Sequence, residues 1–249
     1  MVQVIYGRNA VLAALQSGVQ LNEIRLARGS HGRAIDDILK EASTKGVHVA
    51  WVTQADIERA TGGVSHQGVL AIMDEIPYAD LQDVVAASFK QKKWPFFVLL
   101  DGVEDPHNLG AVIRSAEVMG CSGVVIPKRR SAGLNATVMK VSAGAASRIP
   151  VSQVVNVART LEWFKRESFW VIGADAEARR SLWEVDFKSP LLIVIGGESR
   201  GLGRLTRDKC DVLCRIPMVG RTGSFNVSVA ASIFFYEINR QQQFMEKHL

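Results

Sequence analysis

The chain has 249 residues, of which 47% are hydrophobic and 22% are charged, and its net charge is +5. These values are typical of a globular protein of one large or two smaller domains, and they exclude a disordered or fibrous chain. No apolar stretch approaches the roughly 20 residues that cross a bilayer. Three cysteines, and a start without a basic segment followed by a long apolar one, favour a cytoplasmic protein over a secreted one.

The basic residues are unevenly distributed along the chain. Residues 1–74 hold seven basic and seven acidic side chains, so the whole excess of positive charge lies in the remainder. Such an excess favours a polyanionic partner, because Lys and Arg displace counterions from phosphates. Basic side chains cluster at 90–93, at 128–130 and at 200–207, although each cluster on its own is more typical of a solvated surface.

The first third of the chain alternates short helical and strand patterns. The apolar spacing predicts helices at 9–16, 34–42 and 56–60, and strands at 21–26, 47–52 and 68–73. We interpret residues 1–75 as a small α/β domain. A proline, a helical segment at 81–89 and the basic run that follows mark a change of composition, so we place a linker at 76–94.

Residues 95–249 form the second predicted domain, in which apolar strand patterns alternate with helical patterns. Strands are expected at 96–100, 123–126, 170–174, 191–195 and 214–217, and helices at 109–119, 136–143, 157–165 and 227–239. Apolar strands joined by crossover helices predict an α/β fold with a mainly parallel sheet. In such a sheet ligands bind beyond the carboxyl ends of the strands, so the loops at that edge are candidate sites.

The loop after the strand at 96–100 is rich in polar side chains. Pro106 can set a turn there, and Asn108 can cap the helix that follows. Arg114 lies seven residues after His107 and therefore projects from the same side of the helix, away from its apolar stripe. A guanidinium at this position can bind a phosphate, while a cap at Asn108 and a surface charge at Arg114 are the alternative interpretation.

Two further loops are rich in glycine. The first, GGESRGL at 196–202, allows close backbone approach, but a simple chain reversal fits the pattern equally well. Glu198 in this loop can cap the next helix or orient an arginine. The second, MVGRTGSFN at 218–226, precedes the last helix, for which Ser224 or Asn226 is a candidate N-cap. The amides of a helix that begins after a glycine loop also suit an anionic ligand group.

Metal binding and triad chemistry find little support in the sequence. Cys210 and Cys214 have no further Cys or His nearby to complete a four-ligand zinc site, so we expect no metal. The five histidines are scattered, and only His107 lies beside a candidate site. His66 is more typical of a turn residue at the start of a strand than of a catalyst.

The loops together resemble one family. Three segments resemble the three ordered motifs of the SpoU/TrmH family of RNA ribose 2′-O-methyltransferases: NLGAVIRSAE at 108–117, IGGESRGL at 195–202 and IPMVGRTGSFNVSVAASI at 216–233. YGRNAV near the start and HQGV at His66 resemble the small ribosomal-protein-like domain that binds substrate in many members. The resemblance therefore covers both predicted domains, and the order and spacing of its motifs make it specific.

This resemblance implies a C-terminal trefoil-knot domain, a homodimer and S-adenosylmethionine as the cofactor, without a metal. The members most like this chain methylate a guanosine ribose in 23S ribosomal RNA, so the expected partner is RNA rather than DNA or a membrane. By motif matching, the catalytic positions are Asn108, Arg114, Glu198, Ser224 and Asn226. The cofactor-binding positions are Gly196, Gly197, Ile216, Pro217, Met218 and Phe225. Phe225 departs from the leucine that is more usual in the family.

Two alternatives stay open at this point. One is guanosine 2′-O-methylation of tRNA by a member of the same family, against which the additional first domain counts. The other is a catalytically silent RNA-binding module, against which the complete motif residues count. In either enzyme a guanidinium with a pKa above about 12 is a poor proton acceptor, so we expect Arg114 to hold the target phosphate and to stabilise the developing alkoxide.

Overall fold

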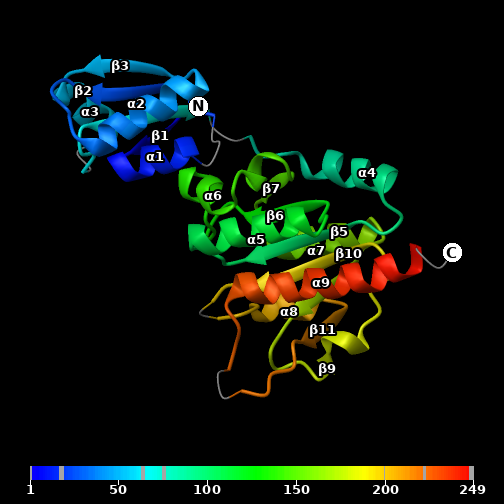
Figure 1. Ribbon diagram of the computed structural model, residues 1–249. Coiled ribbons are helices and arrows are strands. Elements are labelled where there is room, and N and C mark those ends of the chain that lie inside the picture. Colours follow the sequence, from blue (N-terminus) through cyan, green and yellow to red (C-terminus); the bar gives the residue numbers. More distant parts are fainter. Residues whose placement is uncertain are drawn as a thin grey trace. The chain divides into compact units, whose positions relative to one another are not determined.

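The computed structural model describes residues 2–16, 20–62, 65–74, 77–198, 200–220 and 223–246. The chain forms two compact units (Figure 1). The first comprises Met1–Pro77 with Leu134–Gly144, and the second comprises Tyr78–Gly133 with Ala145–Leu249. Every helix and strand that the sequence predicts is present, with ends shifted by a few residues and with the last helix longer than expected.

The first unit contains a four-stranded sheet in the order β1-β4-β2-β3. Strand β4 is antiparallel to β1 and β2, and β2 is parallel to β3. The strands are β1 (Val2–Tyr6), β2 (Glu23–Ala27), β3 (His48–Val52) and β4 (Val69–Asp74). The helices are α1 (Arg8–Gln16), α2 (Arg33–Lys45), α3 (Gln54–Thr61) and α6 (Ala136–Val141). Strand β1 is absent from the prediction.

Local capping explains where the helices of this unit begin and end. The Thr53 side chain accepts a hydrogen bond from the Asp56 amide, and the Asp56 carboxylate accepts one from the Thr53 amide, so a capping box begins α3. Gly46 and Gly62 end α2 and α3 in the left-handed region, at φ values of 66° and 65°. A residue with a side chain is strained there.

The second unit contains a seven-stranded sheet in the order β7-β6-β5-β10-β8-β11-β9. All its neighbouring strands are parallel, which confirms the predicted sheet. The strands are β5 (Phe96–Asp101), β6 (Gly123–Pro127), β7 (Val151–Val154), β8 (Trp170–Ala174), β9 (Arg180–Ser181), β10 (Leu191–Gly196) and β11 (Val212–Arg215). The helices are α4 (Leu81–Gln91), α5 (Pro106–Val118), α7 (Val157–Arg166), α8 (Arg204–Lys209) and α9 (Val227–Glu246), with 3₁₀ turns η1 (Ala145–Ser147) and η2 (Leu182–Glu184).

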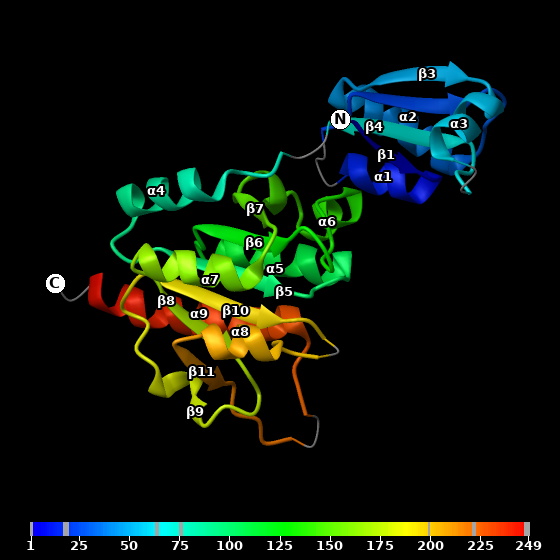
Figure 2. The same cartoon turned by 180° about the vertical axis from the view of Figure 1, so that it is seen from behind.

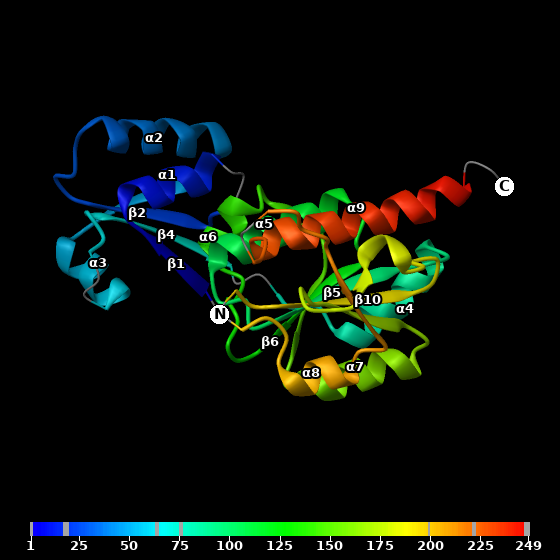
Figure 3. The same ribbon diagram turned by 90° about the horizontal axis from the view of Figure 1, so that it is seen from below.

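Helices cover both faces of this sheet. Helix α9 crosses the sheet in Figure 1, α7 and α8 cover it in the reverse view of Figure 2, and Figure 3 shows the sheet between the two helix layers. Alternate residues of β5 therefore face opposite layers: Phe96 packs against Phe235 of α9, whereas Phe97 packs against Phe164 of α7. Because both faces are covered, the central strands are apolar throughout, and the sequence patterns identify them easily.

The segment predicted as a linker at 76–94 carries helix α4. Asp80 caps this helix by accepting hydrogen bonds from the amides of Gln82 and Asp83. Val85 is buried in the core of the second unit, where Phe97, Phe164 and Phe169 also lie. The apolar side of α4 therefore stabilises the second unit.

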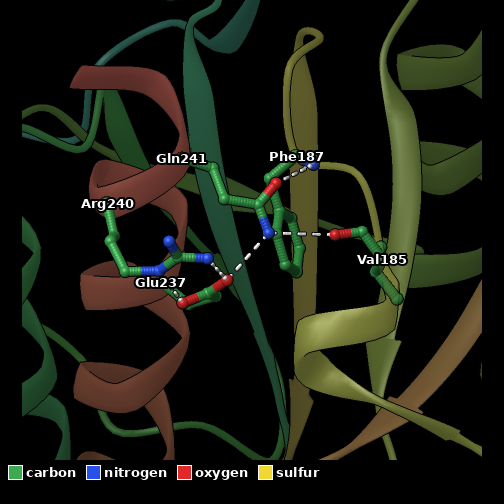
Figure 4. Close-up of polar contacts among 5 residues, drawn as sticks. All are labelled: Val185, Phe187, Glu237, Arg240 and Gln241. Atoms are coloured by element: carbon green, nitrogen blue, oxygen red, sulfur yellow. Dashed lines mark hydrogen bonds and ion pairs between the residues drawn. The ribbon is translucent and has the colours of Figure 1, made fainter. Parts of the chain in front are cut away.

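A polar cluster fixes the C-terminal half of α9 to the segment after η2 (Figure 4). Arg240 donates two hydrogen bonds of 2.7 Å to the Glu237 carboxylate, one to each oxygen. Gln241 donates to the Val185 carbonyl at 3.0 Å, and its own amide oxygen accepts from the Phe187 amide at 3.0 Å. These bonds satisfy backbone groups that have no strand partner, so α9 is held at a fixed position on the sheet.

Substitution of Glu237 is expected to make the stability of the second unit less dependent on pH. The Arg240 guanidinium holds the pKa of Glu237 below its ordinary value, so the carboxylate stabilises the fold at neutral pH and loses that effect as pH falls through the lowered pKa. Glu237→Gln should therefore unfold about 1 kcal/mol more easily at pH 7, with a difference that vanishes once the pH has fallen below the lowered pKa of Glu237. Denaturant unfolding at several pH values measures this. Glu167→Gln at an exposed position is the control, and a difference that stays constant with pH would contradict the prediction.

Candidate active site

The candidate site lies at the carboxyl edge of the central strands β5 and β10. The two strands pair in parallel with Gly196 opposite Asp101, so the loops that follow them begin side by side. The Gly197 amide donates to the Asp101 carbonyl at 2.9 Å. The Thr206 hydroxyl donates to the Asp101 carboxylate at 2.7 Å, which fixes the start of α8 to the same place. The loop after β10 is therefore held against the loop after β5.

Two glycines permit this close approach. A Cβ atom on Gly196 would lie 2.0 Å from the carbonyl carbon of Gly201, and one on Gly197 would lie 2.0 Å from the carbonyl oxygen of Gly102. Neither position has room for a side chain, because the obstructing atoms belong to the backbone. The glycines of GGESRGL thus allow two backbone segments to pack together, beyond reversing the direction of the chain.

Three polar side chains from distant segments meet at this edge. The Asn108 side-chain amide donates a hydrogen bond to the Glu198 carboxylate. The Asn226 side-chain amide donates to the Asn108 side-chain oxygen at 3.0 Å. Asn108 is half-buried, whereas Glu198 and Asn226 are exposed, so the trio faces solvent where a substrate can approach. The structure brings together three of the five predicted catalytic residues.

Asn226 has a second role at the start of α9. Its side-chain oxygen accepts hydrogen bonds from the Ser228 amide at 2.9 Å and from the Ser228 hydroxyl at 2.6 Å. The first is the bond of an N-cap, which confirms Asn226 as the cap of the last helix. The cap fixes the orientation of the side chain, so its amide group is directed toward Asn108.

The predicted cap at Asn108 is wrong. Helix α5 begins at Pro106, and Asp105 is its N-cap, with a carboxylate that accepts from the His107 amide at 2.9 Å. Aspartate is a strong cap, and proline suits the first helical position because its fixed φ matches the helix. Asn108 consequently lies within the first turn, and its side chain is available for Glu198.

The other two predicted catalytic residues lie apart from this hydrogen-bonded trio. Arg114 on α5 is exposed and pairs with no residue in the described part of the chain. Ser224 lies in the loop before α9 and lines the neighbouring pocket. The structure thus leaves the Arg114 guanidinium, with all its donors, available to a ligand.

A pocket opens beside the trio, formed by the carboxyl ends of β8, β10 and β11 and by the start of α9. It is lined by Ala174, Asp175, Ala176, Ile195, Gly196, Gly197, Glu198, Gly201, Cys214, Ile216, Met218, Ser224, Phe225, Val227, Ala230 and Phe234. The predicted cofactor positions all belong to this lining except Pro217. The segment at 174–176 is not among the predicted site residues, although its position directly after a predicted strand is the signal that could have indicated it.

The charges around the pocket are acidic. Asp175 and Glu198 belong to the lining, and among its described residues there is no Lys or Arg. The Asp175 carboxylate pairs with Arg207 at 2.8 Å and accepts from the Glu177 amide at 2.9 Å. Burial raises the pKa of Cys214 to about 12, so its thiol stays neutral and is a poor nucleophile. This pocket suits a ligand with apolar groups and positive charge better than one with phosphates.

The described residues contain no candidate metal site. In the described ranges, no group of three or more His, Cys, Asp or Glu side chains could hold a metal ion. None of the helices in those ranges has both the length and the apolar character needed to cross a membrane.

Comparison with protein families decides the identity. The model of the SpoU rRNA Methylase family matches residues 95–236. The model described as RNA 2′-O ribose methyltransferase substrate binding matches residues 4–79. The chain belongs to the SpoU rRNA methylase family. This confirms the family predicted from the motifs and makes the protein an RNA 2′-O-ribose methyltransferase with a substrate-binding domain before its SpoU domain.

Relatives of similar length agree with this assignment. The chain is 41% identical to the putative TrmH family tRNA/rRNA methyltransferase YacO of Bacillus subtilis, over 96% of this chain and 95% of that protein. It is 43% identical to the 23S rRNA (guanosine-2′-O-)-methyltransferase RlmB of Xylella fastidiosa, over 96% of this chain and 97% of that protein.

A solved structure shares the fold of this SpoU family member over both domains. The SpoU methyltransferase AviRb from Streptomyces viridochromogenes, crystallised with AdoMet, superposes with a TM-score of 0.66. It is 23% identical, and the alignment covers 96% of this chain and 90% of AviRb. The two-domain α/β fold predicted from the sequence is therefore confirmed.

Proposed function

We propose that this enzyme transfers a methyl group from S-adenosylmethionine to the ribose 2′-hydroxyl of a guanosine in 23S ribosomal RNA. The observation that carries the proposal is the meeting of Asn108, Glu198 and Asn226 beside an apolar, acidic pocket. The RlmB relatives, at 43% identity, support guanosine in 23S rRNA as the target. The AdoMet complex of AviRb supports the cofactor.

The pocket residues fit S-adenosylmethionine. Ile216, Met218 and Phe225 offer apolar surface to an adenine ring, and Gly196 and Gly197 belong to the same lining. The Glu198 carboxylate has no cationic partner among the described residues, so it is compatible with a sulfonium and would repel the phosphates of a dinucleotide or of ATP. When bound, the cofactor supplies an electrophilic methyl group.

The residues of this chain position the ribose and stabilise charge. The attacking 2′-hydroxyl releases its proton to solvent water at this exposed edge, so negative charge develops on its oxygen. The exposed Arg114 guanidinium can bind the adjacent phosphate and stabilise this alkoxide. Asn108, oriented by Glu198 on one side and by Asn226 on the other, holds the reacting groups in a fixed geometry.

The basic cluster at 128–130 supports the placement of RNA at this edge. Lys128, Arg129 and Arg130 are exposed, and they follow β6, which is parallel to β5. The Ala132 amide donates to the Val103 carbonyl at 2.9 Å, so this loop is attached to the loop that precedes α5. These three cations pair with no carboxylate among the described residues, so they suit phosphates that flank the target nucleotide.

We further propose that the enzyme is a cytoplasmic homodimer with a knotted C-terminal domain. The close backbone passage at Gly196 and Gly197 supports the knot.

Helix α9 presents an apolar groove lined by Val229, Ile233 and Tyr236, and Tyr236 is 60% exposed. A second copy is the occupant we assign to this groove, because a helix this apolar on its outer side is costly to leave in water. A monomer mass that is independent of concentration in light scattering would contradict the dimer.

A methyl-transfer assay tests the proposed activity. The enzyme is incubated with methyl-labelled S-adenosylmethionine and either deproteinised 23S rRNA or tRNA, and the modified ribose is then mapped. We expect label in 23S rRNA at one guanosine. Label in tRNA alone would instead support the tRNA enzyme. Cofactor binding without transfer to either RNA would indicate the catalytically silent RNA-binding module.

A further inference from the structure

A second polar pocket lies entirely within the first unit. It is formed by the start of α1, the loop after β2 and the turn before β4, and its volume is about 410 Å³. That volume falls in the ~300–1,000 Å³ range of small-ligand sites. The side chains that give it its character are Arg8, Arg28, His31, Gln54 and Gln67. No Asp or Glu belongs to the lining among the described residues.

The positive charges of the two arginines in this pocket have no compensating carboxylate among the described residues. Arg8 donates from Nε to the Gln67 carbonyl at 3.2 Å and from Nη1 to the His31 carbonyl at 3.3 Å, and these acceptors are neutral. Arg28 is exposed, and it pairs with no carboxylate in the ranges that the structure covers. By contrast, Arg25 in the same unit is neutralised by Glu23 at 2.9 Å. A unit whose formal charge is zero over residues 1–74 thus has a local positive site.

Side chains beside the two arginines give the pocket further hydrogen-bonding groups. His31 Nδ1 lies 2.8 Å from the Gly29 carbonyl, which can only accept, so this nitrogen carries a proton. Its Nε2 is left to accept a hydrogen bond from a ligand. The Gln67 side-chain oxygen accepts from the Arg8 amide at 3.2 Å, which leaves its NH₂ group for a ligand.

The floor of the pocket is preformed. The Gly68 carbonyl accepts from the Ala27 amide at 2.9 Å, so the turn before β4 is attached to the end of β2. A Cβ atom on Gly68 would lie 2.7 Å from the Ser30 hydroxyl, and Gly68 has a φ of 73°. The Arg8 guanidinium is also held in place by its two carbonyl partners. Ligand binding therefore requires little ordering of these groups, which favours affinity.

We propose that this pocket binds a phosphodiester group of the RNA substrate, with Arg8 and Arg28 on the phosphate and with His31 and Gln67 on the adjoining ribose. The proposal rests on the proposed function, because it takes RNA as the substrate. Arginine forks and amide donors suit phosphate oxygens and 2′-hydroxyls. The site explains how a charge-neutral unit holds a polyanion.

Arg28→Gln tests the proposal without risk to the fold, because Arg28 is exposed; Arg8→Gln is the second variant. RNA affinity is measured by fluorescence anisotropy with a labelled 23S rRNA fragment over a range of salt concentrations, without cofactor. Each variant should bind about tenfold more weakly, and its slope of log affinity against log salt should fall by about 0.7 to 0.9. In the methylation assay the KM for RNA should rise while kcat and the affinity for S-adenosylmethionine stay unchanged.

Arg59→Gln is the matched control, because Arg59 has an 81% exposed side chain on α3 and lies outside the pocket. It should bind RNA like the wild type. Wild-type affinity and salt slope in Arg28→Gln would overturn the proposal, as would an equal loss in Arg59→Gln, which indicates diffuse electrostatics. The binding assay is independent of turnover. A wild type that binds RNA without methylating it therefore contradicts the proposed activity alone, and its variants still decide the pocket.

Discussion

Arg114→Lys is expected to lower the rate of methyl transfer at saturating RNA and cofactor by about 10²- to 10³-fold. Lysine keeps the charge but replaces a planar fork of five donors with a single ammonium, which cannot bind a phosphate and a developing alkoxide in the same fixed geometry. Because Arg114 is exposed and has no partner within the described residues, the fold should be unchanged. Single-turnover rates measure the effect directly.

The control for this substitution is Arg166→Lys at the exposed end of α7, which should retain the wild-type rate. Thermal unfolding of both variants should match that of the wild type, so a loss of rate in Arg114→Lys can be assigned to chemistry. Full activity in Arg114→Lys would refute a role for the planar guanidinium.

Gly197→Ala is expected to destabilise the second unit by about 3 kcal/mol or more and to abolish cofactor binding. The new Cβ would lie 2.0 Å from the Gly102 carbonyl oxygen and 2.7 Å from its carbon, so the loop after β10 must move away from the loop after β5. This movement breaks the hydrogen bond from the Gly197 amide to Asp101. Calorimetric titration with S-adenosylmethionine and thermal unfolding measure the two effects.

Gly203→Ala is the matched control in the same loop. Gly203 has a φ of −61°, and a Cβ there would meet no atom within 4 Å, so alanine should be tolerated with wild-type stability and affinity. If Gly197→Ala bound the cofactor as the wild type does, the close backbone approach would have no bearing on the pocket.

The central strands of the second unit could be predicted because they are apolar on both sides, whereas β7, β9 and α8 could not. Strand β9 has only two residues, α8 contains a single apolar residue, and two polar residues separate the valines of β7, so none of the three shows an apolar period. The start of α5 was predicted wrongly for a different reason: aspartate and asparagine both cap helices well, and only the structure shows that Asp105 is used in place of Asn108.

The candidate site was predictable only through the order of its motifs. Asn108 lies 90 positions from Glu198 and 118 positions from Asn226, and no local pattern relates residues at such separations. Asp175 was not predicted as a residue of the site, because its partner Arg207 lies in a helix that the sequence does not predict. The pocket of the first unit could not be predicted either, because its arginine, histidine and glutamine side chains come from separate segments of the chain.

The two bonds of Asn226 have a consequence for the synthesis of the enzyme. The same side chain caps α9 and binds Asn108, so the last helix and the catalytic edge are completed together. A nascent chain that has reached only α8 already contains Asn108 and Glu198, but the residue that fixes their geometry has not been made. The candidate site is therefore complete only after the final helix has been synthesised and has folded onto the sheet.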